Sequence, residues 1–131
     1  METIAIVGVG LIGGSFGLAL KQAGFRGTIL GVSSPAAVRA GLDRGAIDRG
    51  ATLEEAAREA DLLYLAQPIG RILDALHHLD PLVRPEALVT DAGSTKHAIV
   101  TAARRLLRRC QFLGGHPLAG KEKRGAAGVN T

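Results

Sequence analysis

The sequence of 131 residues contains no tryptophan and a single cysteine. Its aromatic side chains are one tyrosine and three phenylalanines. A lone Cys110 excludes a disulfide framework and any metal site built on paired cysteines. We expect that thiol to be inert and partly buried, and we expect no metal site. The scarcity of aromatic residues argues against a stacking surface for single-stranded nucleic acid.

Long apolar runs and long runs of one charge are also missing. No segment approaches the roughly 20 apolar residues of a membrane-spanning helix. The first apolar stretch is short and interrupted by glycines, unlike a signal peptide. The net charge of +4 suits anionic ligands, and the basic cluster at residues 104–109 is typical of the solvated end of a helix. We therefore expect a cytoplasmic protein that binds neither membranes nor nucleic acid.

The chain is long enough for one domain with a hydrophobic core, because 47% of its residues are hydrophobic and 21% are charged. Strand and helix signals alternate along it. The expected strands are residues 3–7, 28–32, 61–66, 87–91 and 111–113, and the expected helices are 11–23, 35–44, 52–60, 69–79 and 95–109, with a loop at 45–51. This order predicts an α/β fold, a Rossmann-type doubly wound parallel sheet in three α/β/α layers. We expect a core over residues 1–114, followed at 115–131 by an active-site loop and a tail.

The most informative motif is the glycine pattern that follows the first strand. Gly8 permits a tight turn, Gly10 lets the backbone approach a pyrophosphate, and Gly13 allows the helix to pack on the strand. The pyrophosphate would lie at the helix N-terminus, where unpaired N–H groups favour an anion. The alternative is a plain glycine-rich turn in a chain that has 18 glycines. The strand before and the helix after the motif favour dinucleotide binding.

Polar and glycine-rich segments follow four further strands. They are residues 33–34, 66–68, 91–96 and 114–120. In an open α/β sheet, ligands bind beyond the carboxyl ends of the strands, so we expect all of these segments to converge on one site.

His116 is the candidate for acid–base chemistry, since a neutral imidazole can accept a proton from a substrate hydroxyl near pH 7. Its position alone favours the alternative, a histidine in a surface loop. Ser94 can cap the following helix, present its hydroxyl to a substrate, or do both. Lys96 can bind a carboxylate or remain solvated.

Three motifs together resemble the prephenate/arogenate dehydrogenase family of tyrosine biosynthesis. They are residues 8–15, 91–96 and 115–122, the last containing Gly115-His116-Pro117-Leu118-Ala119-Gly120. The resemblance implies oxidative decarboxylation, in which hydride passes to a nicotinamide and carbon dioxide leaves as the ring becomes aromatic. It further implies that His116 accepts the substrate hydroxyl's proton or hydrogen bond, and that Ser94 and Lys96 complete the substrate contacts. The predicted cofactor contacts are Gly8, Gly10, Leu11, Ile12, Gly13, Ser33, Ser34, Arg39, Gln67 and Pro68.

The end of the second strand bears on the choice of cofactor. An NAD-specific enzyme carries an acidic residue there, whereas this chain has Ser33. Ser33, the helix that begins at Pro35, and Arg39 on that helix would all suit a 2′-phosphate, so we expect NADP in preference to NAD. The alternative is that Ser34 is only a helix cap and Arg39 only solvated.

The resemblance also implies a helical domain that builds a homodimer in the full-length protein. The chain ends before such a domain, so we expect a fragment that binds cofactor but is inactive alone. Two other functions stay open from the residues. One is a two-domain dehydrogenase or reductase of the hydroxyisobutyrate type, and the other is a non-catalytic dinucleotide-sensing module. The sequence does not distinguish prephenate from arogenate as the substrate.

Overall fold

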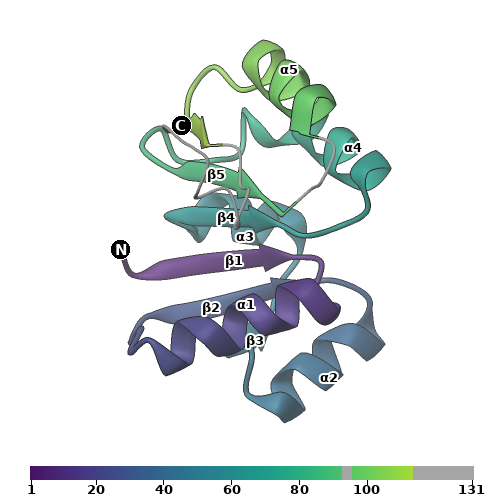
Figure 1. Cartoon of the computed structure of the whole chain (residues 1–131). Coiled ribbons are helices and arrows are strands. Elements are labelled where there is room, and N and C mark those ends of the chain that lie inside the picture. The colour runs from purple at the N-terminus through teal and green to yellow at the C-terminus, as the bar shows by residue number, and fades with distance from the viewer. Residues whose placement is uncertain (93–95, 114–131) are drawn as a thin grey trace.

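The computed structural model describes residues 1–92 and 96–113, which form a sheet flanked by helices (Figure 1). The strands are β1 (Thr3–Val7), β2 (Thr28–Val32), β3 (Arg49–Gly50), β4 (Leu62–Leu65), β5 (Leu88–Asp91) and β6 (Gln111–Leu113). The helices are α1 (Leu11–Gln22), α2 (Pro35–Arg44), α3 (Leu53–Glu59), α4 (Ile69–Leu79) and α5 (Lys96–Leu106). Within this described part, no helix has the length and apolar character needed to span a membrane.

All six strands are parallel, in the order β3-β2-β1-β4-β5-β6. Figure 1 shows β1 in the middle, with β2 and β3 on one side and β4 and β5 on the other. The chain therefore leaves β1 toward one edge and returns to the opposite side of β1 with β4. Ligands bind at such a switch point in doubly wound sheets. The predicted Rossmann-type fold is confirmed.

The two faces of the sheet are covered by different helices. Side chains alternate along each strand, and Ile4, Ala5, Ile6 and Val7 of β1 are all buried. Ala5 and Val7 belong to a core cluster built with α3, α4 and α5. Ile6 belongs to a second cluster that includes residues of α1 and α2. A parallel sheet must be covered on both faces, which explains why its strands are apolar without interruption.

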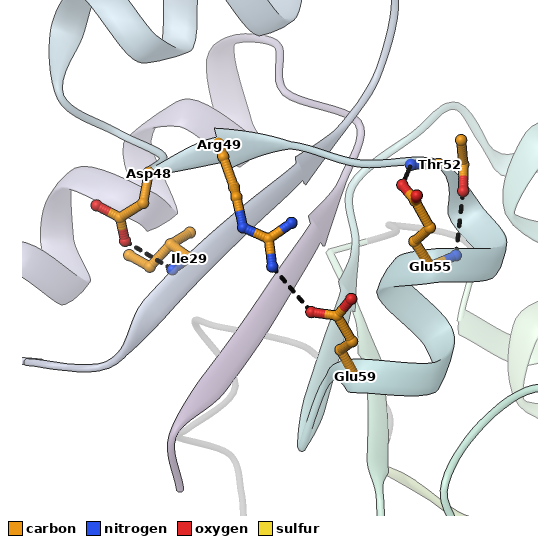
Figure 2. Close-up of polar contacts among 6 residues, drawn as sticks. All are labelled: Ile29, Asp48, Arg49, Thr52, Glu55 and Glu59. Carbon is orange, nitrogen blue, oxygen red and sulfur yellow. Dashed lines mark hydrogen bonds and ion pairs between the residues drawn. The ribbon is translucent and has the colours of Figure 1, made fainter.

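The predicted helix starts are confirmed by their caps. Ser34 accepts a hydrogen bond from the backbone of Ala37, with Pro35 as the first residue of α2. Thr52 and Glu55 form a reciprocal capping box at α3 (Figure 2). Each cap pairs backbone N–H groups that the helix itself leaves free.

One strand is missing from the sequence prediction. Residues 45–51 were expected to form a loop, but Arg49 and Gly50 pair with β2 as the edge strand β3. Lys21 pairs with Asp48 in this segment, and Figure 2 shows two further side-chain contacts that hold it. The Asp48 carboxylate accepts a hydrogen bond from the N–H of Ile29 at 2.7 Å, and Arg49 pairs with Glu59 at 2.9 Å. A strand of two residues has no periodicity of its own, so long-range contacts alone define it.

The last helix is shorter than predicted, since α5 ends at Leu106 and not near Arg109. The backbone N–H groups of Arg108 and Arg109 both donate to the Asp80 carboxylate, at 2.8 and 2.9 Å. A carboxylate that accepts two N–H groups offers the backbone an alternative to helical bonding. Asp80, which follows α4, thus contributes to the end of α5.

Hydrogen bonds to Asp61 hold the amino end of β1 in place. The Asp61 carboxylate accepts hydrogen bonds from the N–H groups of Glu2 and Thr3 at 2.8 and 3.0 Å, and pairs with Arg84. These backbone donors, together with the Arg84 guanidinium, hold the pKa of the Asp61 carboxyl below its usual value. The contact lies at the amino ends of the strands, opposite the predicted site.

Two helical glycines give a direct test of this packing. A Cβ on Gly17 of α1 would lie 2.2 Å from the Ala46 carbonyl oxygen, whereas a Cβ on Gly70 of α4 would meet nothing within 4 Å. We expect Gly17→Ala to lower the free energy of unfolding by about 2 kcal/mol or more, because the backbone must shift. Gly70→Ala should leave it unchanged or raise it by up to about 1 kcal/mol. Denaturant unfolding measures both, and equal stabilities of the two variants would contradict the packing described.

Candidate functional site

The glycine turn after β1 combines two positions that require glycine with one that leaves open space. Gly8 has a φ of +101° and donates its N–H to the Val32 carbonyl at 2.7 Å. A Cβ on Gly8 would lie 2.8 Å from the Ala66 carbonyl oxygen, and one on Gly13 would lie 2.0 Å from the Gly8 carbonyl oxygen. A Cβ on Gly10 would meet nothing within 4 Å. The turn is therefore packed tightly beneath Gly10 and open above it.

The start of α1 supplies free hydrogen-bond donors at this opening. Gly10 is the N-cap and makes no side-chain cap, and the first turn holds no acidic residue. The first helical bond runs from the N–H of Gly14 to the Gly10 carbonyl at 2.8 Å. The N–H groups before Gly14 thus lack helical partners, and together with the helix dipole they favour an anion. Leu11 and Ile12 beside them are 81% and 57% exposed.

A crevice of about 540 Å³ opens in front of the turn. It is lined by the glycine turn, the end of β2 and the loop after β4, through Gly8, Gly10, Val32, Ser33, Ser34, Ala66, Gln67, Pro68 and Arg71. The lining contains no acidic residue, and its one charged side chain is that of Arg71. Three segments distant in sequence therefore meet at the switch point, as the sequence predicts, and the lining carries a positive charge.

The loop after β4, whose Gln67 lines this crevice, contains an unsatisfied polar atom. The Oε1 atom of Gln67 is buried and has no hydrogen-bond partner among the described residues. The N–H of Ala66 donates to the Val7 carbonyl at 2.8 Å, which fixes the loop against β1. A buried acceptor without a donor is costly, so a bound group with an N–H or O–H donor would stabilise this position. The open space over Gly10 and the unpartnered Gln67 both fit a dinucleotide.

The predicted cofactor residues differ in their position relative to the crevice. Gly8, Gly10, Ser33, Ser34, Gln67 and Pro68 line the crevice. Gly13 lies buried beneath it, and Leu11 and Ile12 are exposed at its edge. Arg39 is exposed on α2 and is not part of the lining. Contact of these residues with a cofactor stays a prediction.

Val32, Ala66 and Arg71 line the crevice but are absent from the predicted contacts, and Arg71 is the charged one among them. It lies in the first turn of α4, three residues after Pro68. A cation in the first turn of a helix opposes the helix dipole, and α4 begins at the predicted ligand edge. Those two facts together are a signal that could have identified Arg71.

Both predicted catalytic residues lie beyond the part that the structure describes, and the predicted substrate-binding Lys96 lies at its edge. Ser94 and His116 fall outside the described residues, and Lys96 opens α5 without a described side chain. Next to them in sequence, Asp91 ends β5 with 0% exposure. Burial, and to a lesser extent the Asp91 carboxylate, raises the pKa of Tyr64 on the adjacent strand. The carboxyl end of β5 thus places a buried acidic residue two positions before Gly93.

Cys110 matches its prediction as a partly buried thiol. Burial, with a smaller contribution from Asp80, raises the pKa of that thiol, so little reactive thiolate forms near pH 7. In residues 1–92 and 96–113, no three His, Cys, Asp or Glu side chains are grouped to hold a metal ion.

The parallel sheet, its strand order and the glycine turn at the switch point together define a Rossmann-type nucleotide-binding domain. The model of one family, described as prephenate dehydrogenase, nucleotide-binding domain, matches residues 16–131. The chain belongs to this family. The match favours the prephenate/arogenate dehydrogenase family over the hydroxyisobutyrate type.

Individual relatives agree with the family match. Prephenate dehydrogenase of Lactococcus lactis subsp. cremoris is 40% identical over 135 residues, which cover 99% of this chain and 38% of that protein. Prephenate dehydrogenase of Aquifex aeolicus, solved with hydroxyphenyl propionate and NAD+, has a TM-score of 0.82 at 36% identity and covers 94% of this chain and 44% of that one. Arogenate dehydrogenase of Synechocystis has a TM-score of 0.79 at 35% identity, over 93% and 43% of the two chains. The chain thus spans less than half the length of these relatives.

Proposed function

We propose that this chain binds NADP or NAD in the crevice and forms the cofactor-binding part of a dehydrogenase that oxidatively decarboxylates prephenate or arogenate. The open space over Gly10 at the uncapped start of α1 carries the proposal, since it accepts a pyrophosphate without moving the backbone. The names of the relatives, prephenate and arogenate dehydrogenases, support the substrate class. The NAD+ bound to the Aquifex aeolicus enzyme supports the cofactor class.

The bound nicotinamide supplies the hydride acceptor for the ring carbon that bears the substrate hydroxyl. His116 accepts the proton of that hydroxyl, and Ser94 orients the hydroxyl through a hydrogen bond. Lys96 pairs with a substrate carboxylate. These roles rest on the match of residues 91–96 and 115–122 to the family's motifs.

The proposed role of His116 is tested in an active protein that contains this chain. Because a positioned acid–base group contributes roughly two to four orders of magnitude, we expect His116→Ala to lower kcat by that factor. Dinucleotide affinity should barely change, since the glycine turn holds the pyrophosphate. The matched control is His77→Ala, which removes an exposed histidine of α4. Turnover of the His116 variant equal to that of the control would refute the assignment.

We further propose a preference for NADP over NAD, carried by Ser33 at the end of β2. Ser33 lines the crevice and brings no negative charge to repel a 2′-phosphate. Ser34 and Pro35 start α2 beside it, so the positive end of a helix dipole lies nearby. Arg39 on α2 is a second source of positive charge for the same phosphate.

Ser33→Asp and Ser33→Asn test this preference. We expect Ser33→Asp to weaken NADP binding by roughly 5- to 150-fold, about 1–3 kcal/mol for a like charge close to a phosphate. Asparagine has nearly the same shape as aspartate but no charge, so Ser33→Asn should change the affinity for NADP far less. Calorimetric titration of both dinucleotides measures the effect. Tighter binding of NAD than of NADP by the unsubstituted chain would overturn the preference.

A further inference from the structure

A second hollow of about 280 Å³ continues from the crevice and lies between α3 and α4. Its apolar lining comes from Val7, Val32, Leu53 and Ala75. Val7 and Val32 end the central strands β1 and β2, Leu53 begins α3, and Ala75 lies on α4. The apolar lining and the small volume suit a flat aromatic group, which gains by leaving water on such a surface.

Arg71 stands where the two hollows meet. It lines both of them, as do Val32 and Gln67. The side chain is exposed and makes no ion pair with any described residue. A guanidinium that lacks an acidic partner is free to contact a ligand, and its planar face stacks well on aromatic rings.

The polar lining of the second hollow comes from Gln67, Arg71, Asp74 and His78, so this hollow has an acidic residue that the crevice lacks. Asp74, one turn after Arg71 on α4, lines the second hollow, whereas Ser33 and Ser34 line only the crevice. A carboxylate there would repel a phosphate but would accept a hydrogen bond from an exocyclic amino group. The buried Oε1 atom of Gln67 is a second acceptor without a donor.

We propose that Arg71 determines the affinity for the adenine end of the dinucleotide by stacking its guanidinium on the base, which occupies the second hollow. The inference rests on the proposed dinucleotide binding and adds a residue that none of the sequence motifs contains. Stacking requires the plane of the guanidinium and not only its charge. Arg71 therefore contributes equally to NAD and NADP, which carry the same base.

The experiment titrates the 131-residue chain with NADP, NAD, ADP-ribose and nicotinamide mononucleotide by calorimetry. We expect Arg71→Ala to weaken the three adenine-containing ligands by roughly 5- to 10-fold each, the scale of a cation–π contact. The ratio of NADP to NAD affinity should stay within about twofold, and nicotinamide mononucleotide should bind as before. Arg71→Lys keeps the charge without the plane and should restore little of the loss.

Arg26→Ala is the matched control, because Arg26 is exposed and lies just before β2, at the amino edge of the sheet. It should leave all four affinities unchanged, and thermal unfolding should show all variants folded. A loss confined to NADP, or full rescue by Arg71→Lys, would assign Arg71 to a phosphate and overturn the stacking proposal. Unchanged binding in Arg71→Ala would overturn it while leaving dinucleotide binding intact. A chain that binds neither dinucleotide would overturn the proposed function itself.

Discussion

The close approach of α1 to β1 is the constraint on which the site depends. A Cβ on Gly13 would lie 2.0 Å from the Gly8 carbonyl oxygen, and one on Gly17 would lie 2.2 Å from that of Ala46. Only glycine at these positions lets the helix lie this near the turn after β1 and the loop before β3. The helix then begins at the carboxyl edge with free N–H groups, no acidic residue in its first turn and Gly10 leaving the approach open. The same glycines therefore allow the close packing of α1 and leave its N-terminus open to an anion.

Most of the fold could be predicted from the sequence because its elements carry local signals. The apolar run of β1, the Ser34-Pro35 start of α2 and the capping box at Thr52 each identify an element without distant contacts. The sequence predictions are wrong where contacts with distant residues determine the secondary structure. The strand β3 exists through pairing with β2, and the end of α5 is set by Asp80, which follows a different helix. Neither contact leaves a periodic pattern in the segment that it shapes.

The candidate site was predictable to the extent that strand ends define it. The glycine turn, Ser33-Ser34 and Gln67-Pro68 all follow strands, and the topology brings them to one crevice. Arg71 was not predicted, because it belongs to a helix and not to a segment directly after a strand, and a cation on a helix usually indicates a solvated face. Arg39 lies on α2 outside the lining, and its contact with a cofactor stays a prediction. The motifs describe the ends of strands. They carry no information about which helical side chains border the crevice.

The most direct test of the account is the affinity of Gly10→Ala for NADP and NAD. A methyl group at Gly10 contacts nothing in the protein, so the free energy of unfolding should fall by no more than about 1 kcal/mol, the scale of a less favourable N-cap residue. The same methyl group occupies the space assigned to the pyrophosphate, so the affinity for both dinucleotides should fall by at least about tenfold. Gly70→Ala, also in open space but outside the lining, should bind as the parent does. Unchanged affinity in a stably folded Gly10→Ala chain would contradict dinucleotide binding at this turn.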